Sequence, residues 1–200
     1  MLTDNPAHLI SRLLDVVEND IVPLTRAGVR RGDKVFGGAV LRKTDGALVI
    51  AGTNRETECP LWHGEISTIK ALHELPPEDR PDPKQCLFLS THEPCSMCLS
   101  AITWAGFDNF YYLFSYEDSR DDFAIPHDLR ILEEVFECSE GGYVAENAYW
   151  KSHDIVEIAE GLDRSERDRL AERVANLRTV YAELSQIYQR SKDGNEIPLA

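Results

Sequence analysis

The sequence lacks any run of about 18 apolar residues, the length that a membrane-spanning helix needs, so we expect no transmembrane segment. Residues 1–6 lack the basic region and following apolar run of a secretory signal, which argues against secretion. The five cysteines are an odd number, whereas a disulfide framework uses an even one. We therefore expect free thiols and a reducing, cytoplasmic compartment.

Basic residues are also scarce. The chain has 21 Lys and Arg against 35 Asp and Glu, which gives a net charge of −14. Residues 161–200 hold seven acids and seven bases, so the whole excess of negative charge belongs to residues 1–160. Nucleic-acid binding depends on Lys and Arg that neutralise phosphates, and the one basic cluster is Arg26, Arg30, Arg31 and Lys34. The composition therefore argues against a nucleic-acid partner.

The apolar pattern divides the chain into a domain over residues 1–160 and an added C-terminal segment over residues 161–200. With 42% hydrophobic residues, a chain of 200 residues can bury a substantial core. Strands and helices alternate in the pattern, which favours an α/β fold: a three-layer α/β/α sandwich around a mixed sheet of about five strands. We predict helices at 5–28, 63–75, 94–105 and 126–136, and strands at 34–42, 47–52, 86–91 and 109–114.

The C-terminal segment has the pattern of one long helix, predicted over residues 163–190, followed by a loose tail. Its apolar residues recur at alternating spacings of four and three, which is typical of contact with another helix or a flat apolar surface. The helix could pack on its own domain or lie at or beside the contact of a homodimer. The residues of this stripe are Leu170, Val174, Leu177, Tyr181, Leu184 and Tyr188.

Two short motifs carry chemistry: H-G-E at residues 63–65 and P-C-S-M-C at residues 94–98. His63, Cys95 and Cys98 supply one imidazole and two thiolates, which suit a tetrahedral Zn²⁺ with its fourth position left to water. Glu65 is not needed as a ligand, and a free carboxylate beside such a water is suited to move protons. We therefore predict one Zn²⁺ per chain and a catalytic Glu65.

Both motifs are predicted to begin a helix. Residues two apart do not face one another in mid-helix, so His63 and Glu65 can converge only at the open end of one. Cys95 and Cys98 share a face of the second helix. A purely structural zinc, with His92 as fourth ligand, is the alternative interpretation, and it would leave Glu65 without a role.

The order H-x-E followed by P-C-x-x-C resembles the signature of the cytidine deaminase superfamily. The segments V-F-G-G-A-V-L at 35–41 and H-G-E-I-S-T at 63–68 look like yeast-type cytosine deaminase, whereas Glu93 before Pro94 matches guanine and tRNA adenosine deaminases. The resemblance covers residues 34–113. It implies a cytidine deaminase-like fold and a hydrolase of C–N bonds in cyclic amidines, which replaces an amino group by a carbonyl and releases ammonia.

The resemblance also implies roles for residues outside the two motifs. Asn54 would hydrogen-bond the base through its side-chain amide. The backbone N–H of Gly64 would approach the ring, and Phe36 would form an apolar wall of the pocket. Further candidates for substrate contact are Trp62, Glu93 and Tyr116, of which Tyr116 could also lie in a solvated acidic loop.

We expect the substrate to be a free nucleobase or a related amino-heterocycle, with cytosine and guanine as the first candidates. A tRNA-specific adenosine deaminase is the alternative enzyme. A catalytically inactive subunit that binds zinc as a scaffold is the alternative without activity. Because the enzymes that the chain resembles are typically dimers, we also expect a homodimer. Trp104 is predicted to pack in the core.

Overall fold

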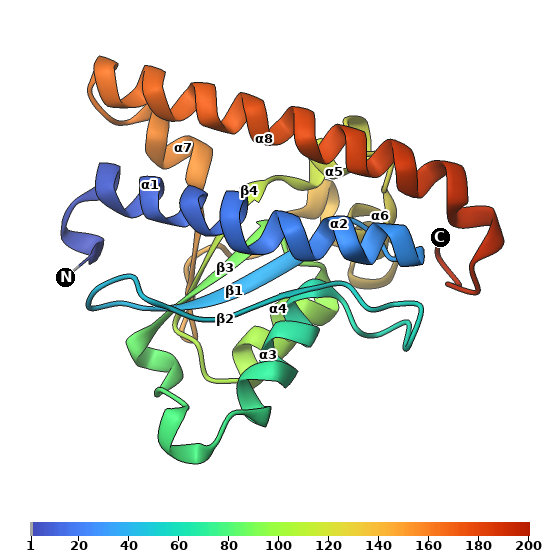
Figure 1. The fold of residues 1–200 in the computed structure, drawn as a ribbon, viewed down its shortest axis with the longest axis horizontal. Helices are drawn as coiled ribbons and strands as arrows, with labels where there is room; N and C mark the ends of the chain where they lie inside the picture. The colour runs from blue at the N-terminus through green and yellow to red at the C-terminus, as the bar shows by residue number, and fades with distance from the viewer. Residues whose placement is uncertain (1) are drawn as a thin grey trace.

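The computed structural model describes residues 2–200 and places a mixed five-stranded sheet between two layers of helices (Figure 1). The strand order across the sheet is β2-β1-β3-β4-β5. Strand β1 runs antiparallel to both of its neighbours, whereas β3, β4 and β5 are parallel to one another. The predicted mixed sheet of about five strands is therefore confirmed. The strands are β1 (Gly37–Arg42), β2 (Leu48–Thr53), β3 (Cys86–His92), β4 (Asn109–Phe114) and β5 (Lys151–Asp154).

Helices cover both faces of this sheet. Helices α3 and α4 lie on one face, while α1, α2 and α7 lie on the other, with the long α8 running across them (Figure 1). This is the predicted three-layer arrangement with an added C-terminal helix. The helices are α1 (Pro6–Val16), α2 (Val22–Arg31), α3 (Gly64–Glu74), α4 (Ser96–Trp104), α5 (Tyr116–Asp121), α6 (His127–Phe136), α7 (Ile155–Glu160) and α8 (Arg164–Ser191).

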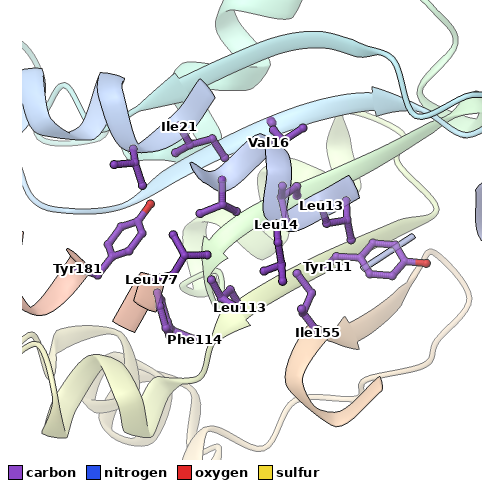
Figure 2. Close-up of a cluster of buried hydrophobic side chains, with 14 of the residues drawn as sticks. Leu13, Leu14, Val16, Ile21, Tyr111, Leu113, Phe114, Ile155, Leu177 and Tyr181 are labelled. Atoms are coloured by element: carbon purple, nitrogen blue, oxygen red, sulfur yellow. The ribbon is translucent and has the colours of Figure 1, made fainter. Parts of the chain in front are cut away.

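The apolar stripe of α8 is used within its own chain. All six residues of the stripe are buried in the larger core, where Leu177 and Tyr181 meet side chains of α1 and β4 (Figure 2). Arg173 fixes the helix further, because its guanidinium lies 2.7 Å from the carboxylate of Asp15 and 2.8 Å from that of Glu18. Of the two alternatives for this stripe, packing on its own domain is therefore the observed one.

Truncation of this stripe should destabilise the whole fold. Leu177→Ala removes a side chain that is 3% exposed and leaves a cavity, so we expect a loss of about 2–5 kcal/mol in the free energy of unfolding. Ile187→Ala is the matched control on the same helix, since Ile187 is 46% exposed. Urea denaturation followed by circular dichroism measures both. Equal effects of the two substitutions would contradict the observed packing of α8.

The opening helix ends later than predicted. It continues through a π-helical turn at Val17–Ile21, just before Pro23, and ends at Arg31, where Gly32 adopts a left-handed φ of 101°. Proline has no N–H to donate into the preceding turn, and such a wide turn accommodates this loss. The predicted stop at Gly28 is therefore wrong. Gly28 instead packs within the helix, where an added Cβ would lie 3.5 Å from the backbone oxygen of Asn54.

Three elements after residue 115 were not predicted. Helix α5 occupies the stretch read as an acidic loop, and β5 and α7 follow α6. Strand β5 consists of Lys-Ser-His-Asp and has no apolar alternation, so only its pairing with β4 identifies it. Trp104 was predicted in the core and is 90% exposed, so that prediction is wrong. No helix among residues 2–200 is both long and apolar enough to cross a membrane.

Candidate metal centre

The open ends of two helices bring the predicted zinc ligands together. His63 is the residue that caps the N-terminus of α3, and Cys95 caps the N-terminus of α4. Neither side chain makes the usual capping hydrogen bond to its own helix. Cys98, in the first turn of α4, completes a group whose three possible ligand atoms all lie within 4.8 Å of one another. The predicted placement of both motifs is thus observed.

The spacing of these atoms suits zinc. His63 Nδ1 lies 3.5 Å from Cys95 Sγ and 3.8 Å from Cys98 Sγ. A tetrahedral zinc with Zn–S of about 2.3 Å and Zn–N of about 2.0 Å separates sulfur from nitrogen by about 3.5 Å. Both the donor types and their separations fit this ion. The Cys-Cys-His set leaves a fourth position, as catalytic zinc sites do.

The three ligand side chains lie so close together that they shift the pKa values of one another. A hydrogen bond from Cys98 is the main cause that lowers the pKa of the Cys95 thiol well below its usual value of 9.0. Burial lowers the pKa of His63, but the hydrogen bond and the charge of Cys95 outweigh it and raise that pKa to about 9. Burial raises the pKa of the third ligand, Cys98, well above its usual value. Because a cysteine must lose its proton to bind a metal, zinc would displace the protons that this group holds.

Glu65 lies beside the ligand group without being part of it. Its side chain is buried, Ser90 Oγ donates to Oε1 at 2.8 Å, and Oε2 lies 3.3 Å from Cys98 Sγ. Because Ser90 occupies Oε1, Oε2 is the oxygen on the metal side. Burial, with a contribution from the charge of Cys95, raises the pKa of Glu65. A carboxyl group with a raised pKa can hold a proton as well as accept one.

Gly64 allows α3 to approach the sheet closely. An added Cβ would lie 2.6 Å from Gly37 Cα and 2.9 Å from the carbonyl carbon of Phe36, which is closer than nonbonded atoms can come. Only glycine fits here without moving the start of β1. This contact sets His63 and Glu65 beside the Phe36–Gly37 backbone.

A cavity of about 330 Å³ opens next to the metal ligands. His63, Cys95 and Phe36 line it, so the structure brings this predicted wall residue to the site. Its walls are mainly apolar, and Ile197 closes one side although residues 191–200 were predicted to be a loose tail. The other lining residues are Lys34, Glu56, Pro60, Leu61, Ser96, Met97, Ile125, His127, Asp128, Ile131, Pro198 and Leu199.

Asn54 is fully buried and does not line this cavity, but it contacts Glu56, which does. The Nδ2 group of Asn54 donates to Glu56 Oε2 at 2.5 Å. A carboxylate accepts hydrogen bonds only, so the NH₂ side of the amide must face it. The Oδ1 of Asn54 has no hydrogen-bond partner among the described residues. A buried acceptor without a partner is costly unless a ligand satisfies it.

The three further candidates for substrate contact, Trp62, Glu93 and Tyr116, do not line the cavity. Two cations lie over the ring of Trp62: the guanidinium carbon of Arg55 is 5.6 Å and the Nζ of Lys70 5.5 Å from its ring centroid. Glu93 Oε2 accepts from the backbone N–H of Tyr116 at 3.1 Å, and Tyr116 Oη donates to the carbonyl of Pro94 at 2.6 Å. The two hydrogen bonds of Tyr116 hold the segment that precedes Cys95 in place. All three residues thus contact other parts of the protein and do not line the cavity.

His92 is not a fourth ligand in this arrangement. It ends β3 in an aromatic cluster, with its ring centroid 4.7 Å from that of Phe36 and 5.1 Å from that of Phe114. Burial lowers its pKa to about 3, so the ring is neutral. Among residues 2–200, the metal-binding group consists of His63, Cys95 and Cys98 alone. The alternative of a structural zinc closed by His92 is therefore not supported.

Sequence reasoning missed the charged residues of the cavity. Lys34, Glu56 and Asp128 line it, yet in the sequence each looks like an ordinary surface charge. The carboxyl group of Asp128 makes no hydrogen bond to the described residues, and its pKa is raised by burial and by the charge of Cys95. The position of Lys34 directly before the apolar segment 35–41 was the one available signal for its burial.

The sequence of this chain is similar to those of known proteins. Residues 23–114 match the family described as the cytidine and deoxycytidylate deaminase zinc-binding region. The guanine deaminase of Bacillus subtilis (strain 168) is 35% identical over 103 residues, which are 50% of this chain. The chain spans 64% of the length of that relative.

Solved structures with a similar arrangement include a guanine deaminase from Nitrosomonas europaea. It is 22% identical with a TM-score of 0.47, over 86% of this chain and 85% of that one. A structure from a study of tRNA:A34 deaminases is 21% identical with a TM-score of 0.41, over 68% of this chain and 98% of that one.

Proposed function

We propose that this chain is a zinc-dependent hydrolase acting on a free nucleobase or related amino-heterocycle, because residues 23–114 match the cytidine and deoxycytidylate deaminase zinc-binding region. The reaction replaces an exocyclic amino group by a carbonyl and releases ammonia. The observation that carries the proposal is the buried Glu65 carboxyl group beside, but outside, a His-Cys-Cys zinc site. Guanine is the first candidate substrate, because the relative at 35% identity is a guanine deaminase, and cytosine is the second.

His63, Cys95 and Cys98 would hold the zinc. When bound, the zinc supplies a Lewis acid that acidifies water for attack on the amidine carbon of the ring. Glu65 Oε2 would accept a proton from the attacking water and pass it to the ring nitrogen. It would then carry the remaining proton of the added hydroxyl group to the amino group, so that the C–N bond breaks, ammonia leaves and a carbonyl remains. Ser90 holds the carboxyl group in place through Oε1 during both transfers.

The cavity suits a small planar ring. Its volume of about 330 Å³ lies at the lower end of the range for ligand pockets, and its apolar walls can pack against both faces of a heterocycle. We propose that Asn54 Oδ1 accepts a hydrogen bond from a ring N–H or amino group. Asp128, which lines the cavity and has a pKa raised by burial, would bind polar edge atoms of the ring.

The C-terminal residues should contribute to substrate binding. Ile197→Ala removes part of the cavity wall, so we expect KM to rise about tenfold with little change in kcat, which corresponds to about 1.4 kcal/mol of binding. Glu196→Ala is the control, since Glu196 is exposed and does not line the cavity. Steady-state ammonia release gives both constants. An unchanged KM in Ile197→Ala would show that the substrate does not reach this wall.

The charges on the protein give little support to the alternative of tRNA adenosine deamination, because few basic side chains are available to bind phosphates. Two members of the basic cluster are already paired, Arg31 with Asp33 at 3.1 Å and Lys34 with Glu56 at 2.8 Å. Binding of tRNA should be strongly salt-dependent and detectable in a mobility-shift assay. Specific binding together with anticodon deamination would replace our proposal by this alternative. An inactive zinc scaffold is disfavoured by the intact Glu65.

An ammonia-release screen tests the proposed substrate class. The zinc-loaded protein is offered cytosine, guanine, adenine, cytidine, guanosine, triazines and pterins at equal concentrations. We expect the fastest release from guanine and slower release from the nucleosides, because the relative at 35% identity is a guanine deaminase. Release from no free base would contradict the proposal.

We further propose a homodimer in the cytoplasm. The stripe of α8 is already covered by its own chain, so a dimer must use another surface. Trp104 on α4 is 90% exposed and Tyr149 is 70% exposed, and large exposed aromatic side chains are typical of protein contacts. All five cysteines are free thiols, as a reducing compartment permits. Light scattering should give twice the chain mass, and a monomer at micromolar concentration would contradict this assembly.

A further inference from the structure

Two hydrogen-bond donors and the imidazole of His63 converge on one buried carboxylate, that of Glu56. Lys34 Nζ lies 2.8 Å from Oε1, and Asn54 Nδ2 lies 2.5 Å from Oε2. His63 Nε2 lies 3.6 Å from Oε1. Glu56 and Lys34 are both almost completely buried, at 3% and 5% exposure. This carboxylate therefore joins a predicted zinc ligand, a predicted base-binding amide and a cation of the cavity wall.

The geometry assigns each nitrogen of His63 a different task. Nδ1 faces the two sulfur atoms, so it is the nitrogen that can bind a metal. Nε2 faces the Glu56 carboxylate. A metal-binding histidine commonly directs its other ring N–H to a carboxylate, which fixes the tautomer and the ring orientation. At 3.6 Å the attraction between an N–H dipole and a carboxylate already favours the proton on Nε2.

We propose that Glu56, held in place by its ion pair with Lys34, is a positioning residue of the zinc site. It orients the His63 imidazole so that Nδ1 is available to the metal, and it turns the amide of Asn54 so that Oδ1 faces away from the carboxylate. This inference rests on the proposed function for the zinc site but does not depend on which base is the substrate. Glu56 touches neither the metal nor the sulfur ligands.

Only a carboxylate can fulfil this role at position 56. It has acceptor sites on both oxygens and no donor, so it can accept from Lys34, Asn54 and His63 together. A glutamine has one acceptor oxygen, and its NH₂ group would face at least one of the three donors. Glu56→Gln should therefore disturb the imidazole even though the side chain keeps its size.

The test is the zinc affinity of Glu56→Gln, measured by competition with a chelator. We expect the dissociation constant to rise about 10–100-fold, as for other losses of an outer carboxylate partner of a metal-binding histidine. Glu58→Gln is the matched control two residues away, because its carboxylate forms an exposed ion pair with Arg55. The control should bind zinc as tightly as the unaltered protein.

Glu56→Gln leaves Lys34 buried without a counter-charge, which can itself impair folding. The double substitution Lys34→Met/Glu56→Gln removes both charges. We expect its metal-free form to melt at a higher temperature than that of Glu56→Gln, while its zinc affinity stays weakened because the carboxylate is still missing. A purely structural role predicts that melting temperature changes and zinc affinity does not.

The outcomes separate this inference from the proposed function. If the unaltered protein binds zinc and both variants bind it equally well, Glu56 is not a positioning residue, while the proposed zinc site stands. If the unaltered protein does not bind zinc, both proposals are wrong. Weakened binding in both variants, with a normal Glu58→Gln control, is the result that we expect.

Discussion

Glu65→Gln is expected to abolish deamination while zinc stays bound. Glutamine keeps the size of the side chain and can still accept the hydrogen bond from Ser90, which lies 2.8 Å from Oε1. It cannot take up and release protons near neutral pH. Loss of a positioned general acid–base typically costs 10²–10⁴-fold in rate, and Glu65 is proposed to serve two proton transfers. We therefore expect kcat to fall by at least about 10³-fold.

The measurement combines ammonia release with metal analysis of the same sample. Glu74→Gln serves as the control on the same helix, since the Glu74 side chain is 62% exposed and pairs with Lys70 at the surface. It should leave both turnover and zinc content unchanged. Turnover of Glu65→Gln within a few-fold of the unaltered protein would exclude the proposed mechanism.

Cys95→Ala should cause nearly complete loss of zinc. Cys95 Sγ is the sulfur closest to His63 Nδ1, at 3.5 Å, and a hydrogen bond from Cys98 lowers its pKa. Without it, one sulfur and one nitrogen would remain, and two protein ligands rarely hold zinc. Metal analysis after gel filtration should give about one zinc per chain in the unaltered protein and almost none in Cys95→Ala.

Cys59→Ala distinguishes loss of a ligand from loss of any thiol. Cys59 lies four residues before His63, but it is not part of the metal-binding group among residues 2–200. We expect full zinc content in this variant. Full zinc content in Cys95→Ala as well would mean that the ion, if present, is held elsewhere.

The part of the site that the sequence predicted is local in the chain. Each motif spans no more than five residues, and the helix that each begins sets the direction of its side chains. Cys95 and Cys98 therefore had to share a face, and His63 and Glu65 had to meet at a helix end. The sheet then brings the two helix ends together, because β1 and β3 are neighbours and α3 and α4 lie on the same face.

The charged residues around the cavity could not be predicted, because burial of a charge depends on tertiary partners. Lys34 and Glu56 are separated by 22 residues, and only the fold places their charged groups 2.8 Å apart. The opposite error occurred at Trp104, whose aromatic side chain predicts burial although the end of α4 is exposed. The sequence around Lys34, Glu56 and Trp104 has no local pattern that shows whether each side chain has a partner in the fold.

The C-terminal segment shows the same limit. The spacing of its apolar residues predicted a helix at 163–190, and α8 occupies Arg164–Ser191. The stripe is covered by α1, α2 and β4, which are distant in the chain, and by α7, which directly precedes α8. The contact of Ile197 with the cavity likewise depends on where α8 ends relative to α6.

The most direct test of a zinc-dependent deaminase is a zinc titration of the metal-free protein with guanine as substrate, followed by ammonia release. We predict that activity rises in proportion to added zinc and stops rising at about one equivalent per chain, since each chain supplies one set of three ligands. In Cys95→Ala the same titration should give no activity. Ammonia release that is equally fast before zinc is added, or absent at every zinc concentration with every base tested, would contradict the account.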